Sequence, residues 1–164
     1  MSISTFSKGG EHDSPGVVII PPMVFYICLL LGGAFEFFAP SDLPVIPKLI
    51  RIILGLVIGC SGFAFMMIAH EQFKRVKTNV RTNLPAKTLV VQGAYRISRN
   101  PMYVGISAFF LGIGLAVGSV WMLTAYIPLG LYLSLYVIPL EEAYMERTFG
   151  EDYKVYCRNV RRWL

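Results

Sequence analysis

The sequence predicts an all-α, polytopic membrane protein with about four transmembrane helices, the last two paired as a hairpin, and a C-terminal interfacial helix. Two observations support this prediction. Hydrophobic residues make up 55% of the 164 residues and charged residues only 15%, whereas soluble domains average about 25% charged residues. No charged residue occurs over the 40 positions Pro101–Leu140, a stretch long enough for two helical crossings of a bilayer. An ordinary soluble domain and a disordered chain are therefore excluded.

The uncharged runs and the breaks between them place each element. We expect one membrane domain over residues 1–164, with a flexible polar lead over 1–16 and transmembrane helices over 17–39, 49–69, 102–117 and 120–140. Prolines between Pro40 and Pro47 separate the first two helices, because proline cannot continue a helix. Pro21-Pro22 either occupies the first turn of the first helix or makes that helix begin later. Gly118-Ser119 leaves room only for a tight turn between the last two helices.

The distribution of Lys and Arg predicts the orientation of the chain. Twelve of the fifteen basic residues lie in two segments, residues 70–100 and residues 141–164. The positive-inside rule places the 70–100 loop, the 141–164 tail and both termini in the cytoplasm. We expect the first helix to be a retained anchor rather than a cleaved signal peptide, because acidic residues directly precede it.

Several kinds of chemistry and partner are not indicated. The three cysteines form no CxxC motif, and the two histidines, His12 and His70, are far apart, so no metal site is expected. The net charge of +5 comes without a nucleic-acid recognition motif, so no nucleic-acid partner is expected. The Gly55-x-x-x-Gly59 pattern fits either a homo-oligomer or packing within one bundle.

Chemically informative residues gather at the ends of the predicted hairpin. Arg96, Arg99 and Tyr103 precede or begin the helix over 102–117, and Glu141-Glu142 follow the helix over 120–140. The arginines suit a carboxylate, the glutamates an ammonium, and a tyrosine ring suits a cation. Asn100 with Pro101 predicts a helix N-cap followed by proline at the first helical position. Taken singly, each residue is also explained as a membrane anchor or a helix start.

These residues resemble a known superfamily. The string Gly93-Ala-Tyr-Arg-Ile-Ser-Arg-Asn-Pro-Met-Tyr-Val-Gly105 is followed by Glu141-Glu142, Phe149-Gly150, Tyr153, Tyr156 and Arg161-Arg-Trp163. Together they resemble the isoprenylcysteine carboxyl methyltransferase and phospholipid methyltransferase superfamily, over roughly residues 74–164. The resemblance implies an integral membrane enzyme that uses S-adenosylmethionine, with the 141–164 tail covering the cofactor. Its substrate would be a lipophilic small molecule or lipid that enters from the bilayer.

The resemblance also implies roles for individual residues. Asn100 stands where many members have histidine, and because an amide does not titrate near neutrality it argues against a general base there. The acceptor stays open between an isoprenylcysteine-like carboxylate, an amine and a thiol, and no metal is required. The implied catalytic residues are Arg99 and Glu142, and the implied cofactor-binding residues are Gln92, Gly93, Tyr95, Arg96, Asn100, Tyr103, Glu141 and Glu142.

Further expectations concern the two polar segments. The short helix after Gly150 would lie on the membrane surface. Aromatic side chains would enter the interface, namely Phe149, Tyr153, Tyr156 and Trp163, and basic side chains would meet lipid headgroups, namely Lys154, Arg158 and Arg162. Thr78, Asn79 and Arg81 are weaker candidates for ligand contact. The alternative to an enzyme is a non-catalytic four-helix membrane protein, such as an assembly factor or a small transporter subunit.

Overall fold

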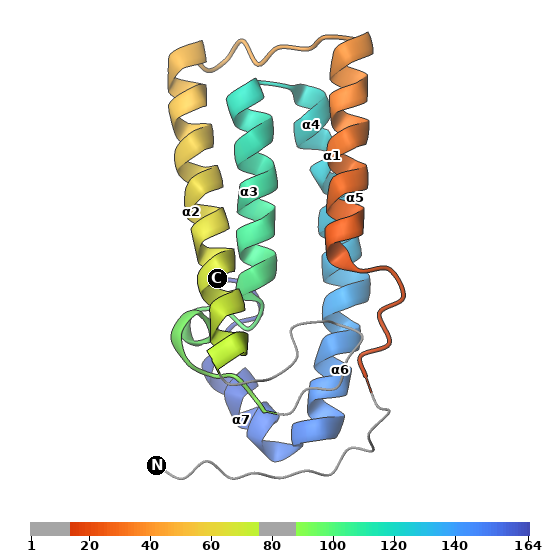
Figure 1. Ribbon diagram of the computed structural model, residues 1–164, viewed down its shortest axis with the longest axis vertical. Helices are drawn as coiled ribbons and strands as arrows, with labels where there is room; N and C mark the ends of the chain where they lie inside the picture. The colour runs from red at the N-terminus through yellow and green to blue at the C-terminus, as the bar shows by residue number, and fades with distance from the viewer. Residues whose placement is uncertain (1–13, 76–87) are drawn as a thin grey trace.

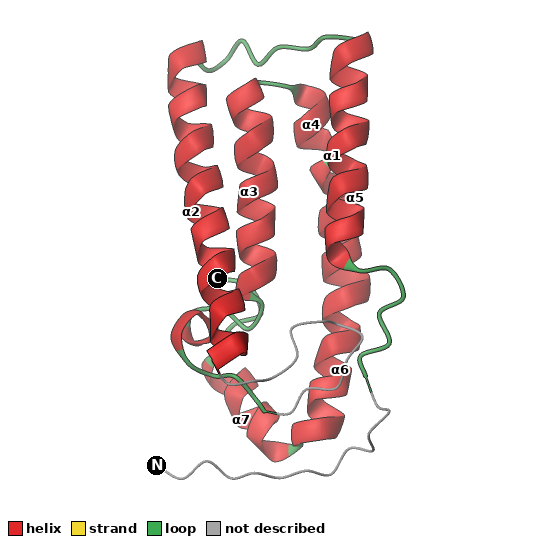
Figure 2. Ribbon diagram, in the orientation of Figure 1, coloured by secondary structure: helices red, strands yellow, loops and turns green. Residues whose placement is uncertain are grey.

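Helices form every regular element within residues 14–75 and 88–164, the parts of the chain that the computed structural model describes (Figure 1, Figure 2). Three helical stretches there are long and apolar enough to cross a membrane: Pro21–Phe38 (α1), Lys48–Arg75 (α2) and the run Val120–Phe149. A fourth apolar helix, Pro101–Val117 (α3), is shorter. The prediction of a helical, polytopic integral membrane protein is confirmed.

Two helix boundaries differ from the prediction. α1 begins at Pro21 rather than at residue 17, because Pro21-Pro22 occupies its first turn, where a missing N–H costs no hydrogen bond. α2 continues through residues 70–75, so the expected loop over 70–100 begins later. Residues 70–75 contain no proline or glycine, and a polar sequence alone does not end a helix. Within the loop, Gly93–Arg96 forms a short 3₁₀ helix, η1.

The last transmembrane stretch is not one regular helix over 120–140. It divides into Val120–Thr124 (α4), Tyr126–Tyr132 (α5), a π-helical turn over Leu133–Val137 (η2) and Ile138–Phe149 (α6). Pro128 has no N–H to offer the carbonyl of Thr124, and Pro139 has none for the carbonyl of Leu135. The break after α4 and the π-turn occur at these two carbonyls, so the two prolines account for both irregularities.

Small residues bring α2 and α3 into close backbone contact along their length (Figure 1). A Cβ atom added at Gly112 would lie 2.5 Å from the Cα of Gly59, and one added at Gly55 would lie 2.5 Å from the backbone N of Ala116. The Gly55-x-x-x-Gly59 pattern therefore serves packing within the chain. α1 packs instead on α4 and α5, and its Phe25 also contacts the rings of Phe109 and Phe110 in α3.

A polar clasp joins the two interhelical turns at the end of the bundle that holds Gly118. The Glu36 carboxylate accepts hydrogen bonds from the hydroxyls of Ser41 and Ser119. The Arg51 guanidinium is ion-paired with Asp42 and is buried against Gly118, whose φ of 81° is in the left-handed region. Glu36 thus faces the N-terminus of α4, and Arg51 faces the C-terminus of α3. Each charge has the sign that the dipole of that helix end favours.

At the opposite end, which we call the α7 end, the chain turns at Gly150 into Glu151–Asn159 (α7) and then returns toward the start of α3 (Figure 1). Tyr153 and Tyr156 of α7 are buried in a cluster with Ala69, Ala94 and Tyr95. Their expected placement in the membrane interface is therefore wrong. The aromatic face of an amphipathic helix packs equally well on protein and on lipid, and here the protein covers it.

Candidate functional site

The loop before α3 is held by the returning C-terminal segment, which comprises residues 160–164. The backbone N–H of Arg99 donates to the carbonyl of Arg161 at 2.9 Å. The side-chain amide of Asn100 donates to the carbonyl of Arg162 at 2.9 Å, and the Ser98 hydroxyl donates to the same oxygen at 3.3 Å. Asn100 and Pro101 occupy the predicted N-cap and first helical positions, but the Asn100 side chain does not cap α3. Its side-chain amide is used to hold the tail.

Glu142 of α6 lies between two guanidinium groups. Arg99 Nη1 is 3.2 Å from one carboxylate oxygen, and Arg162 binds both oxygens, with Nε at 3.0 Å and Nη2 at 2.5 Å. Arg99 Nη1 also donates to the sulfur of Cys157. Burial lowers the pKa of Arg99, but the Glu142 carboxylate and the neighbouring Cys157 and Tyr153 raise it by more, so the group stays a cation.

Glu141, the neighbour of Glu142, faces the interior of the bundle. It accepts a hydrogen bond from the Tyr103 hydroxyl at 2.7 Å, across 38 residues of sequence. Tyr95 is buried beside it, with its ring edge-on to Phe73 and its carbonyl accepting from the Tyr156 hydroxyl at 2.7 Å. Burial, followed by the charge of Glu141, raises the pKa of Tyr95, so its phenol stays protonated.

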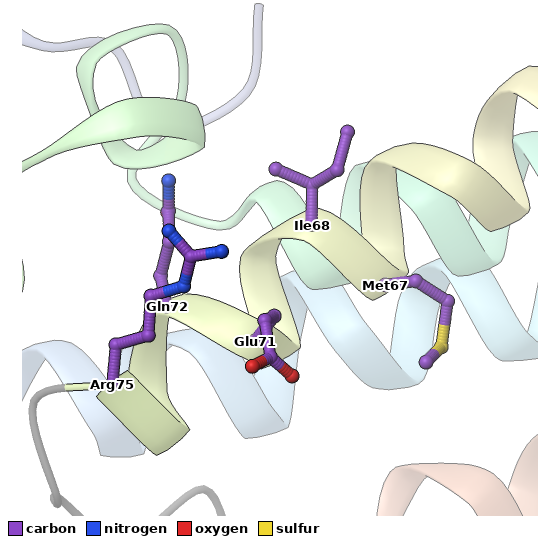
Figure 3. A pocket seen from close by; sticks show the side chains of 5 residues that line it. All are labelled: Met67, Ile68, Glu71, Gln72 and Arg75. Carbon is purple, nitrogen blue, oxygen red and sulfur yellow. The ribbon is translucent and has the colours of Figure 1, made fainter.

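The end of α2 forms one side of this region. Gly93 has a φ of 58°, and a side chain there would overlap the amide of Gln72. Figure 3 shows Gln72 pointing toward the loop that carries η1. An open cavity of about 370 Å³ lies along the same helix, lined by Met67, Ile68, Glu71, Gln72 and Arg75. Glycine is thus required at position 93 both by its backbone angle and by the close approach of α2.

The structure gathers most of the residues that the sequence predicts. The structure brings together at the α7 end Tyr95 from η1, Arg99 and Asn100 from the loop that follows it, Tyr103 from α3, and Glu141 and Glu142 from α6. Gln92 and Arg96 are exposed and take no part in the ionic cluster. Thr78, Asn79 and Arg81 lie outside the described residues. No group of three or more His, Cys, Asp or Glu side chains is arranged for a metal within residues 14–75 and 88–164.

Three participants were not predicted: Gln72, Cys157 and Arg162. Arg162 was expected at lipid headgroups, and this is wrong, because it pairs with Glu142. The only sequence signal was its place in Arg161-Arg-Trp163, near the end of a tail that turns at Gly150. A basic residue beside a membrane pairs with a phosphate or with a buried carboxylate by the same chemistry, so sequence alone does not choose between them.

The model of the family described as phospholipid methyltransferase matches residues 50–152. The matched region contains Arg99, Asn100, Tyr103, Glu141 and Glu142, and it ends before Cys157 and Arg162. No curated protein and no solved structure matches the chain.

Proposed function

Because the chain belongs to the phospholipid methyltransferase family, we propose that it transfers a methyl group from S-adenosylmethionine to a lipophilic acceptor at the α7 end of the bundle. The observation that carries the proposal is the convergence of Arg99 from the loop before α3, Tyr103 from α3, and Glu141 and Glu142 from α6. All four lie inside the family match. The basic residues near this end support a cytoplasmic orientation for both termini.

The residues present fit the cofactor chemically. Arg99 Nε and the Tyr95 hydroxyl are buried polar atoms with no hydrogen-bond partner among the described residues. Buried polar groups usually have partners, so these two atoms suggest a ligand. S-adenosylmethionine offers a carboxylate to the arginine, hydroxyl and ring nitrogen atoms to the phenol, and an ammonium to the carboxylates. The donor and acceptor types therefore match.

The arrangement supports distinct roles for these side chains. Arg99 binds the carboxylate of the cofactor through charge-assisted hydrogen bonds, and Glu142 fixes the position of the Arg99 guanidinium. Glu141, held by Tyr103, faces the cationic part of the ligand. When bound, S-adenosylmethionine supplies a methyl group on a cationic sulfonium. The chain aligns the two reactants and excludes water, and this role requires no general base at Asn100.

Calorimetry with S-adenosylhomocysteine and the detergent-purified protein tests the proposal. We expect the wild-type chain to bind and Arg99→Ala to bind about 10–150-fold more weakly, because a hydrogen bond to a charged group contributes about 1.5–3 kcal/mol. The matched control is Arg158→Ala, which breaks an exposed ion pair with Glu151 and should leave the affinity unchanged. If the wild-type protein gives no heat of binding at millimolar S-adenosylhomocysteine, the proposal is refuted in favour of a non-catalytic membrane protein.

The acceptor can be identified separately. Membrane lipids are incubated with the protein and S-adenosylmethionine, and mass spectrometry then looks for a species that gains one methyl group in place of hydrogen. The gain should require both the wild-type protein and the cofactor. Its appearance at a carboxylate, an amine or a thiol decides between the three acceptor classes.

A further inference from the structure

Arg162 forms the closest ionic contact of the site although it lies ten residues beyond the family match. Its guanidinium binds both oxygens of Glu142, a fork-to-fork geometry that is stronger and more specific than a single contact. The Glu142 side chain is only 18% exposed, and that of Arg162 is 46% exposed. The arginine therefore reaches from the surface to a carboxylate that is largely removed from water.

Because two arginines share Glu142, the number of hydrogen bonds that Arg99 makes to this carboxylate is changed. One carboxylate and two guanidinium groups leave a net charge of +1 on the cluster. Arg99 touches Glu142 with Nη1 alone, at 3.2 Å, and its Nε has no hydrogen-bond partner among the described residues. Without Arg162, Glu142 would be free to take two hydrogen bonds from Arg99, since bidentate pairing is the preferred geometry. Because Arg162 occupies Glu142, the Nε edge of the Arg99 guanidinium stays available for a hydrogen bond to a ligand.

The backbone of the C-terminal segment makes a second, independent connection. The carbonyls of Arg161 and Arg162 hold the Ser98–Asn100 loop from which Arg99 projects. The side chain of Trp163 packs against the core cluster that contains Tyr103 and Ile138. The segment therefore contacts the loop that bears Arg99, the core cluster that contains Tyr103 and the glutamate of α6.

We propose that Arg162 is a positioning residue for cofactor binding: it holds Glu142 bidentately, and the free edge of Arg99 then receives the carboxylate of the S-adenosyl amino acid. The inference rests on the proposed function, and it concerns the amino-acid part of the ligand rather than its nucleoside.

Two probes separate these parts of the ligand. S-adenosylhomocysteine carries the amino-acid carboxylate, and 5′-methylthioadenosine has the same nucleoside and thioether without it. In calorimetry, Arg162→Gln should lower the affinity for S-adenosylhomocysteine by about tenfold or more, because a charge-assisted contact is lost. The affinity for 5′-methylthioadenosine should stay unchanged. Arg162→Lys should recover part of the affinity, because it restores the charge but not the fork. The backbone acceptor at residue 162 stays in every variant, and Arg158→Gln is the surface control.

A double-mutant comparison checks that Arg162 acts through Glu142. With Glu142→Gln already present, adding Arg162→Gln should cause no further loss of S-adenosylhomocysteine affinity. Additive losses would overturn the inference, and so would equal weakening of both probes or no weakening by Arg162→Gln. If the wild-type chain bound neither probe, the proposed function itself would fail and the inference with it.

Discussion

Replacing Gly112 with alanine tests the close packing of α2 on α3, on which the position of the loop before α3 depends. A Cβ at residue 112 would lie 2.5 Å from the backbone N and Cα of Gly59 and 2.7 Å from the carbonyl oxygen of Gly55. Non-bonded carbon atoms pack at about 3.5–4.0 Å, so the helices must separate by about 1 Å. All three atoms belong to the backbone, and no side chain can move aside to relieve the overlap.

The expected cost follows from two opposing effects. Overpacking of this kind destabilises by about 1–3 kcal/mol, and alanine regains up to about 1 kcal/mol over glycine inside a helix. We expect a net loss of about 1 kcal/mol, measured by reversible unfolding in mixed micelles. A displacement of about 1 Å at reacting groups costs about 100-fold in rate. Methyl transfer should therefore fall by more than the loss of folded protein explains.

Two other glycines serve as controls, Gly59 of α2 and Gly33 of α1. A Cβ at Gly59 would meet its nearest atom at 3.7 Å, and one at Gly33 would meet nothing within 4 Å. Gly59→Ala and Gly33→Ala should therefore keep or slightly raise the stability, even though Gly59 belongs to the Gly-x-x-x-Gly pattern. Equal damage from Gly59→Ala and Gly112→Ala would refute this register of α2 on α3, as would an unperturbed Gly112→Ala.

Other substitutions separate burial from hydrogen bonding in the tyrosine cluster. Tyr156→Phe should cost about 1 kcal/mol, because it removes the hydrogen bond to the Tyr95 carbonyl. Tyr95→Phe should cost nothing measurable at neutral pH, because its hydroxyl has no partner among the described residues. Burial raises the pKa of Tyr95 above its unfolded value of about 10, so the protonated phenol carries no penalty below pH 10 and the free energy of unfolding falls as pH rises above it. In Tyr95→Phe the free energy of unfolding, followed by circular dichroism, should fall less steeply as pH rises above about 10. An unchanged slope against pH would contradict the assignment of this loss to Tyr95. Gly93→Ala should cost more than about 1–2 kcal/mol in thermal unfolding, because the φ of 58° alone costs about that much and the new side chain also overlaps the amide of Gln72. Adding Gln72→Ala should remove only the steric part of the cost.

The spans and most of the site are predictable because each depends on short-range information. An uncharged run long enough to cross a bilayer identifies a span whatever the rest of the chain does. The two-residue turn at Gly118-Ser119 then brings the start of one helix beside the end of the next. Arg99 and Glu142, 43 positions apart in the sequence, are therefore expected together, and the structure places them 3.2 Å apart.

The remaining features depend on contacts that leave no local pattern. Tyr153 and Tyr156 form an apolar stripe that would suit lipid as well as protein, and the positions of η1 and of the end of α2 decide between them. Arg162 binds Glu142 because the chain reverses at Gly150 and passes the Ser98–Asn100 loop. The breaks around α5 did have a signal in Pro128 and Pro139. A proline indicates that a hydrogen bond is missing, but not whether the helix bends, widens or ends there.

The position of the site depends on the far end of the bundle as well as on its own contacts. Tyr103 lies 15 residues before Gly118 in the sequence, which is about 22 Å along α3. At that distance a rotation of about 3° at the Gly118-Ser119 turn moves Tyr103 by about 1 Å, enough to lengthen its 2.7 Å hydrogen bond to Glu141 beyond useful range. The clasp of Glu36 and Arg51 fixes that turn at one end, and the C-terminal segment joins α3 to α6 at the other. The polar groups of both ends therefore act on the same quantity, the angle between α3 and the run Val120–Phe149.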